Sequence, residues 1–76
     1  MRGLIINELE RLSATRNYLW TFKQWIAFYN ELNPKEQEMF SKEIMGLISN
    51  GILIEELDGS VINYRLTDKG FDIIYS

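Results

Sequence analysis

Histidine and cysteine are both absent from this 76-residue chain. Without cysteine, the chain can form neither a disulfide nor a thiolate metal site. Without histidine, it lacks the commonest general base and the commonest neutral metal ligand. Neither a Ser-His-Asp nor a Cys-His arrangement can therefore be built. We expect a protein that is not an enzyme, with no catalytic residues, no bound cofactor and no metal site.

Long hydrophobic runs are missing too. No apolar stretch approaches the ~20 residues that a helix needs to span a bilayer. The single proline excludes long polyproline segments, and the chain has neither a glycine-rich phosphate loop nor a calcium-loop spacing. Together with the lack of cysteine, these absences predict a cytoplasmic protein with no membrane partner and no evident small-molecule substrate.

The residues that are present indicate one small globular domain. The composition is 46% hydrophobic and 25% charged, which is typical of a folded domain and argues against disorder. A chain of this length forms a single domain over residues 1–76, with no room for a second. It buries only ~60% of the surface that its unfolded form exposes, so we expect modest stability unless a partner helps.

The chain begins with a predicted helix over about residues 2–12. Ile5, Leu9 and Leu12 recur at helical spacing and therefore share one face. Residues 13–20 break this period. They indicate a loop with room for a short extended piece.

A second helix is predicted over about residues 22–32, where Thr21 can cap the first turn. Its apolar stripe consists of Phe22, Trp25, Ile26 and Tyr29. Phe28 lies well off that stripe, which places it outside the predicted core.

The third helix has the clearest start in the chain. Asn33 is a good N-cap, Pro34 suits the first helical position, and Glu36 can complete a capping box. The helix runs to about Asn50, and its buried stripe consists of Phe40, Ile44, Leu47 and Ile48. Gly46 inside it costs about 1 kcal/mol relative to alanine, which indicates either close packing or a tolerated defect.

A β-hairpin follows, and two turn registers are open. A two-residue turn at Asp58-Gly59 would pair Leu57 with Ser60, whereas a three-residue loop would pair Glu56 with Ser60. The two-residue turn places on one face Leu53, Glu55, Leu57, Ile62 and Tyr64.

The three-residue loop gathers the larger apolar face. On that face it places Ile52, Ile54, Ile62, Tyr64 and Leu66. We favour this register because the hydrophobic pattern selects register wherever one face is buried. It leaves Leu57 at the tip, apolar and exposed. After the hairpin, Thr67 can cap a short last helix that carries Phe71, Ile74 and Tyr75.

Two segments carry a resemblance to a known fold. Residues 47–56, LISNGILIEE, look like the end of a recognition helix that runs into a first wing strand. Residues 64–74, YRLTDKGFDII, are similar to the LT-x-x-G segment that follows the second wing strand in many bacterial transcription regulators. The chain thus resembles a winged-helix (winged helix-turn-helix) domain. We expect an α+β fold with a three-helix core, a C-terminal β-hairpin wing and a short last helix.

This resemblance implies a DNA-binding role in transcription regulation. The third helix would enter the major groove, and the hairpin would touch the backbone or the minor groove. The candidate DNA contacts are the polar side chains of these two elements: Lys35, Gln37, Glu38, Lys42, Ser49, Asn63 and Arg65. Each of them also has a plain interpretation as part of a solvated surface.

The charge of the same segment disfavours DNA as the partner. Residues 34–66 hold three basic and six acidic side chains, so they carry −3, the formal net charge of the whole chain. Lysine and arginine contacts to phosphate supply most of the non-specific affinity for DNA. An acidic wing instead favours a protein-interaction module that has kept the fold and lost the basic surface.

The aromatic residues point the same way. Ten of the 76 residues are Phe, Trp or Tyr, and Tyr18 and Trp20 fall outside every predicted stripe. For these two we favour packing over the core from their loop, with a place in a protein interface as the alternative. Phe28, Met45 and Leu57 lie outside the core by periodicity or register, so they are the candidates for a protein interface.

Two functions therefore stay open. One is a DNA-associated regulatory module that acts as a dimer, and the other is a module that binds a protein partner or a second copy of itself. Binding to DNA would weaken steeply as salt rises, whereas docking through apolar residues would not.

Overall fold

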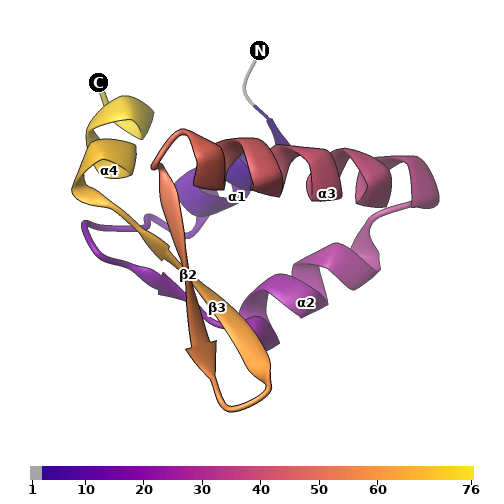
Figure 1. The fold of residues 1–76 in the computed structure, drawn as a ribbon. Helices are drawn as coiled ribbons and strands as arrows, with labels where there is room; N and C mark the ends of the chain where they lie inside the picture. The colour runs from indigo at the N-terminus through magenta and orange to yellow at the C-terminus, as the bar shows by residue number, and fades with distance from the viewer. Residues whose placement is uncertain (1–2) are drawn as a thin grey trace.

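The chain folds into a small α+β domain with a three-stranded antiparallel sheet (Figure 1). The computed structural model describes residues 3–76. Its elements are α1 (Leu4–Arg11), β1 (Leu19–Trp20), α2 (Phe22–Glu31), α3 (Pro34–Ser49), β2 (Leu53–Asp58), β3 (Val61–Leu66) and α4 (Asp68–Ile74). The predicted α+β class is confirmed. The predicted start of the first helix, residue 2, lies outside the described residues.

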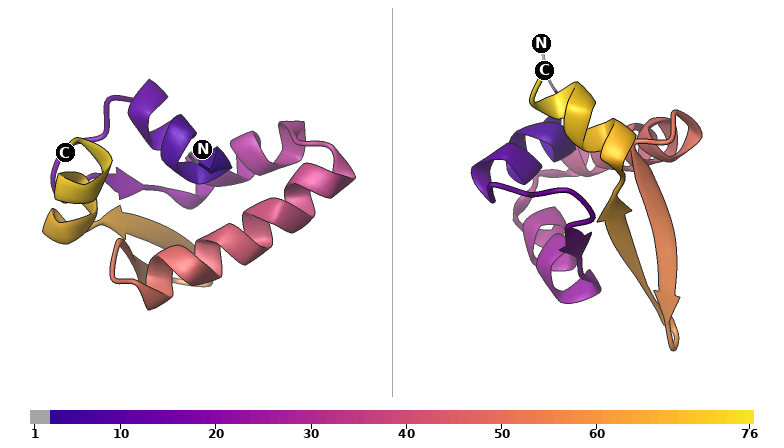
Figure 2. Two further views of the ribbon diagram at one scale, coloured as in Figure 1. Left: turned by 90° about the horizontal axis from the view of Figure 1, so that it is seen from above. Right: turned by 90° about the vertical axis from the view of Figure 1, so that its left-hand side faces the viewer.

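The helices gather on one side of the hairpin. Figures 1 and 2 show α1 beside α3, with α2 running at an angle to α3. The strand order is β1-β3-β2, so β3 is central and β2 is an edge strand. The β2–β3 hairpin extends away from α1 and α4, and its tip reaches past α2 (Figure 2).

A carboxylate of α3 secures the start of α1. Glu43 Oε2 accepts hydrogen bonds from the backbone N–H groups of Ile5, at 3.0 Å, and Ile6, at 3.4 Å. The first N–H groups of a helix have no partner within the helix, and the helix dipole favours an anion there. Glu43 therefore serves the packing of α1 on α3, where Ile5 and Leu9 are buried.

The predicted caps of the next helices are confirmed. Thr21 precedes α2, where Gln24 Oε1 accepts from the Thr21 N–H at 3.1 Å. Asn33 precedes α3 and accepts from the N–H of Glu36 at 2.8 Å, while Glu36 accepts in return at 3.1 Å. A methyl group added to Gly46 would meet nothing within 4 Å. Gly46 is therefore a tolerated defect, not a site of close packing.

Trp20 lies at the centre of the core. It belongs to β1, opposite Tyr64 of β3, and only 1% of its surface is exposed. Its ring centroid lies 6.2 Å from that of Phe40 and 6.0 Å from that of Phe28. The prediction that this loop residue folds over the core is confirmed, and the extended piece of the loop is strand β1.

The predicted position of Phe28 is wrong. Phe28 is half-buried and packs against the core, in contact with the rings of Trp20 and Phe40. The prediction from periodicity assumed that α2 buries only one face, and Phe28 lies off that face. Trp20 comes from β1 and covers a second face of the helix, so the buried arc is wider.

Both predicted hairpin registers are wrong. Asp58 pairs with Val61, so the two-residue loop is Gly59-Ser60. Gly59 has φ +65°, whereas Ser60 does not have a positive φ. A positive φ at the first loop position alone is the requirement of a type II′ turn, which favours glycine there.

The observed register decides which side chains face the core. Directly paired residues share a face, so Leu53 lies with Leu66, Glu55 with Tyr64, and Leu57 with Ile62. This is the face that the rejected two-residue turn predicted, although its pairing is shifted. Ile54 lies on the other face, opposite Arg65, and is 50% exposed.

The LT-x-x-G segment joins the sheet to α4. Thr67 Oγ1 accepts from the Gly70 N–H at 2.9 Å and donates to the Gly51 carbonyl at 2.6 Å. A methyl group on Gly70 would overlap the Ile52 carbonyl oxygen and lie 2.9 Å from a methyl of Leu66. Thr67 thus caps α4 as predicted, and the glycine permits the close approach of α4 to the chain before β2.

Candidate functional site

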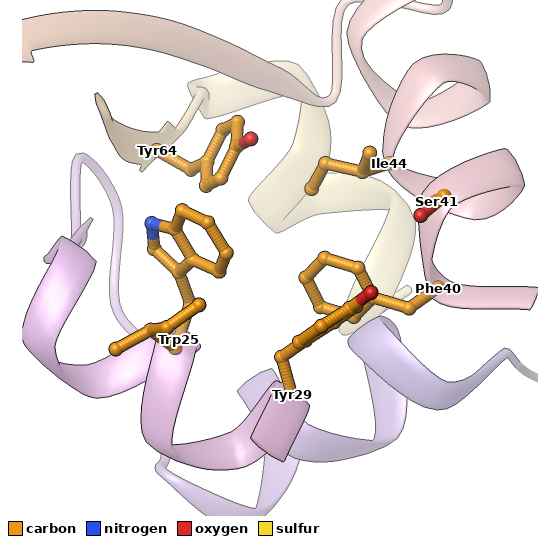
Figure 3. Close-up of a pocket in the computed structure, with 7 residues that line it drawn as sticks. Trp25, Tyr29, Phe40, Ser41, Ile44 and Tyr64 are labelled. Atoms are coloured by element: carbon orange, nitrogen blue, oxygen red, sulfur yellow. The ribbon is translucent and has the colours of Figure 1, made fainter. Parts of the chain in front are cut away.

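An aromatic hollow opens between α2, α3 and β3. Its volume is about 310 Å³, and it is lined by Trp25, Ile26, Tyr29, Phe40, Ser41, Ile44 and Tyr64. Figure 3 shows these side chains converging from the three elements. We call this feature the aromatic hollow. Its volume falls at the small end of the range for binding pockets.

Contacts between the rings hold the walls of the hollow in place. Trp25 stacks on Phe40 with centroids 6.0 Å apart, and Tyr29 meets Phe40 edge-on at 5.2 Å. Trp25 Nε1 also donates to the Ile62 carbonyl of β3 at 2.8 Å. This hydrogen bond satisfies the polar group of the indole and ties α2 to the hairpin. The hollow is therefore a preformed feature of the packed domain.

The apolar surface continues along the hairpin. Leu57 and Ile62 are paired directly on the face that carries Tyr64. Leu57 is 76% exposed, and Ile62 is half-buried against the core. Exposed apolar residues that adjoin a hollow are the usual marks of an interaction site. We call the aromatic hollow with Leu57 and Ile62 the hollow–hairpin surface.

One carboxylate stands beside this surface. Glu55 is exposed and pairs directly with Tyr64, which lines the hollow. Burial of the phenol and the charge of Glu55 both raise the pKa of Tyr64 above its usual value. Within residues 3–76, no salt bridge engages Glu55 or Asp58. The hairpin therefore presents unpaired negative charge next to the aromatic rings.

Two of the candidate DNA contacts hold the fold together. Asn63 is 8% exposed, and its Oδ1 accepts from the Phe22 N–H at 2.8 Å. Gln37 is half-buried and donates to the Tyr29 carbonyl at 3.1 Å. These side chains connect β3 to α2 and α3 to α2, so their polar groups are already engaged.

Arg65 is engaged as well. Its guanidinium forms a bidentate salt bridge with Glu56, and it also donates to the Asn17 carbonyl at 2.8 Å. The hydrogen bond from Arg65 lowers the pKa of Glu56, and the same bond raises the pKa of Arg65. Arg65 is the one cation among residues 51–66. Its pairing leaves Glu55 and Asp58 as the uncompensated charges of the hairpin.

The remaining candidates lie on the outer face of α3. Lys35, Lys42 and Ser49 are exposed there, and Lys42 Nζ lies 3.8 Å from Glu38 of the preceding turn. Because Glu43 caps α1, it does not add to the charge of this face. The structure thus separates these side chains and Glu38 from Gln37, Asn63 and Arg65, and does not bring all seven candidates into one surface.

Two of the three interface candidates are exposed as predicted. Met45 on α3 is 69% exposed, and Leu57 is the most exposed large apolar residue described. Phe28 is the exception already noted. Sequence reasoning missed the aromatic hollow because Trp25, Tyr29, Phe40 and Tyr64 were all interpreted as core. The sequence holds ten large aromatic residues, more than a core of this size needs, and this surplus was the available signal for the hollow.

Comparison with known proteins supplies no relative: no family model, no curated protein and no solved structure matches this chain. Among the described residues, no helix has both the length and the apolar character that crossing a bilayer requires.

Proposed function

We propose that this chain is a non-enzymatic winged-helix module that binds a protein partner through the hollow–hairpin surface. The element order α1-β1-α2-α3-β2-β3-α4 supports the winged-helix assignment. So does the role of Thr67 and Gly70, which gives the LT-x-x-G resemblance a physical reason.

The observation that carries the proposal is the pairing of Arg65 with Glu56 beside an exposed Leu57. A wing that binds DNA needs free cations for phosphate, and the one cation of this hairpin is already neutralised. What the hairpin offers instead is an apolar side chain that is 76% exposed, next to a hollow walled by aromatic rings. Aromatic and apolar anchors surrounded by polar groups are the usual composition of a protein interface.

DNA binding is the second candidate function, and one observation favours it. Lys35, Lys42 and Ser49 share the outer face of α3, the face that would enter the major groove in a winged-helix complex. Three of the six acids in residues 34–66 do not add free negative charge to this face. Glu36 and Glu43 accept hydrogen bonds from the backbone at helix starts, and Glu56 pairs with Arg65. Binding through α3 alone would still lack phosphate contacts from the hairpin.

A matched pair of variants separates the two functions. Ser41 lies at the hollow and is exposed, whereas Ser49 lies on the outer face of the same helix. Ser41→Lys places a long cationic side chain at the hollow, and Ser49→Lys adds the same charge to the other face. Both sites are exposed, so both variants should fold.

The experiment is photo-crosslinking in cells that make the protein, with a photoreactive phenylalanine in place of Leu57. Protein docking predicts a discrete crosslinked partner that is lost in S41K and retained in S49K. DNA binding predicts no such partner, and it predicts that S49K strengthens binding to a DNA duplex. A crosslink that both variants retain equally would contradict docking at the hollow.

A further inference from the structure

We propose that the aromatic hollow receives an arginine side chain from the protein partner. This inference rests on the proposed function, because it names the group that the partner inserts. The partner segment would present one arginine flanked by apolar residues. The arginine would enter the hollow, and an apolar neighbour would pack against Leu57 and Ile62.

The lining of the hollow has the chemistry that a guanidinium recognises. Four of its seven residues are aromatic, the other three are Ile26, Ser41 and Ile44, and none is charged. Ring faces carry partial negative charge and attract a cation that lies over them. Arginine is favoured over lysine because its planar guanidinium also stacks on aromatic rings and is less strongly hydrated.

Glu55 supplies the counter-charge. It lies directly opposite Tyr64 on the same face of the hairpin, and within residues 3–76 it has no salt-bridge partner. A guanidinium stacked on Tyr64 would lie within reach of this carboxylate, which can accept two parallel N–H donors. Burial of the phenol and, after it, the charge of Glu55 raise the pKa of Tyr64, which agrees with the closeness of the carboxylate to this ring.

The size of the hollow suits one side chain. Pockets for drug-sized ligands range from about 300 to 1,000 Å³, and this hollow of about 310 Å³ lies at the bottom of that range. The adjoining apolar pair on the hairpin can then hold the flanking residues of the segment. A single anchoring side chain in a pocket, with near-neutral contacts around it, is the usual design of an interface hot spot.

Charge favours another protein over a second copy of this chain as the source of the arginine. In a second copy, the arginines of residues 3–76 are already engaged, since Arg11 pairs with Glu8, Arg16 with Asp72 and Arg65 with Glu56. It would also bring the acidic hairpins of two chains together, each chain having a net charge of −3. Nucleic acid fails for the same reason, because its phosphates would meet Glu55 and Asp58.

The test uses two capped five-residue peptides and the two tryptophans of the chain. One peptide has arginine at its centre between leucines, and the other has citrulline, which keeps the shape and removes the charge. NMR follows the indole N–H of Trp25, which lines the hollow, and that of Trp20, which is buried and serves as the internal control. We expect the arginine peptide to shift only Trp25 and to bind at least about threefold more tightly, the change expected of an exposed cation–π contact.

Two variants test the counter-charge. Glu55→Gln should weaken the preference for arginine, whereas Asp58→Asn should keep it, since Asp58 lies on the opposite face of β2. Equal binding of both peptides at Trp25 would overturn the arginine inference and leave the proposed docking in place. No shift at Trp25 with either peptide, or an arginine preference that E55Q leaves undiminished, would also overturn it. The crosslinking experiment tests docking at the hollow–hairpin surface independently of whether the partner inserts an arginine.

Discussion

Asn63 of β3 accepts a hydrogen bond from the backbone N–H of Phe22, the first residue of α2, at 2.8 Å. The N–H groups of a first helical turn have no partner within the helix, so a buried one needs a side-chain acceptor. Asn63 supplies that acceptor from the middle of the sheet. A residue that the winged-helix resemblance assigns to DNA contact therefore joins the sheet to α2.

Replacing Asn63 with alanine should destabilise the domain. The Phe22 N–H would lose its partner in a part-buried position, which costs about 1–3 kcal/mol. Urea unfolding followed by tryptophan fluorescence measures the change. Asn30→Ala, on the exposed face of α2, should not destabilise the domain. A variant N63A of unchanged stability would contradict the structural role of this side chain.

Two glycines should respond to alanine in opposite directions. Gly46 lies inside α3 with free space around it, so Gly46→Ala should stabilise the domain by up to about 1 kcal/mol. Gly59 has φ +65° at the first position of the hairpin loop, so Gly59→Ala should cost about 1–2 kcal/mol through backbone strain alone. Thermal unfolding of both variants measures the difference. A stabilising G59A would contradict the type II′ turn and the register that follows from it.

Gly70 should tolerate no side chain. A methyl group there would overlap the Ile52 carbonyl oxygen and crowd Leu66, both of which are buried and fixed by the sheet and helix packing. Overpacking of this kind costs about 1–3 kcal/mol or more. Gly70→Ala should therefore lower the urea midpoint more than G59A does, because it adds steric overlap to an otherwise relaxed backbone. Equal stability of G70A and the parent protein would contradict the packing of α4 described above.

The salt bridge of the hairpin should make stability depend on pH. The hydrogen bond from Arg65 lowers the pKa of Glu56 in the folded state, so Glu56 binds a proton more readily in the unfolded chain. The resulting stabilisation is present above the unfolded pKa of about 4.3 and is lost as the pH falls through the lower folded pKa.

Glu56→Gln removes this contribution. Its urea midpoint should lie below that of the parent protein at pH 6, and the two should converge as the pH falls toward 3. Asp58→Asn, at a carboxylate outside the salt bridges of the described chain, provides the control and should not reproduce this convergence. A constant gap between E56Q and the parent protein at every pH would contradict the role of the Glu56–Arg65 pair.

Local signals predicted the helices well. Thr21, Asn33 and Thr67 are the N-cap residues of the helices they were expected to cap, since capping contacts form between residues within three positions of each other. The stripe through Phe40, Ile44 and Leu47 is buried because it repeats at the helical period. These features depend on residues that are neighbours in the sequence.

The hairpin register depended on information that alternation could not supply. Ile52, Leu53 and Ile54 are consecutive apolar residues, so each face of the hairpin had an apolar candidate. The turn selects the face, and neither register predicted from the sequence has the type II′ loop Gly59-Ser60. Alternation therefore favoured the face of Ile54, which is exposed in the folded chain.

The candidate site was the hardest part to predict. Residues such as Trp25 and Tyr64 were correctly assigned to the interior side of their elements, but whether a core is filled or leaves a hollow depends on three-dimensional packing. Trp20 and Phe28 show the same limit, since the position of one depends on the other across the fold. The net charge of −3 over residues 34–66 was a clearer argument against DNA binding than any single site residue was for it. The Glu56–Arg65 pair strengthens that argument.

The most direct test of the account is an amide-resolved NMR titration with a short mixed-sequence DNA duplex at low salt. Docking of a protein partner at the hollow–hairpin surface predicts that no amide of residues 34–45 or 55–65 shifts, even at high duplex concentration. Shifts in both segments that fade as salt is added would show that α3 and the hairpin bind DNA despite their acids. That result would contradict the proposed function.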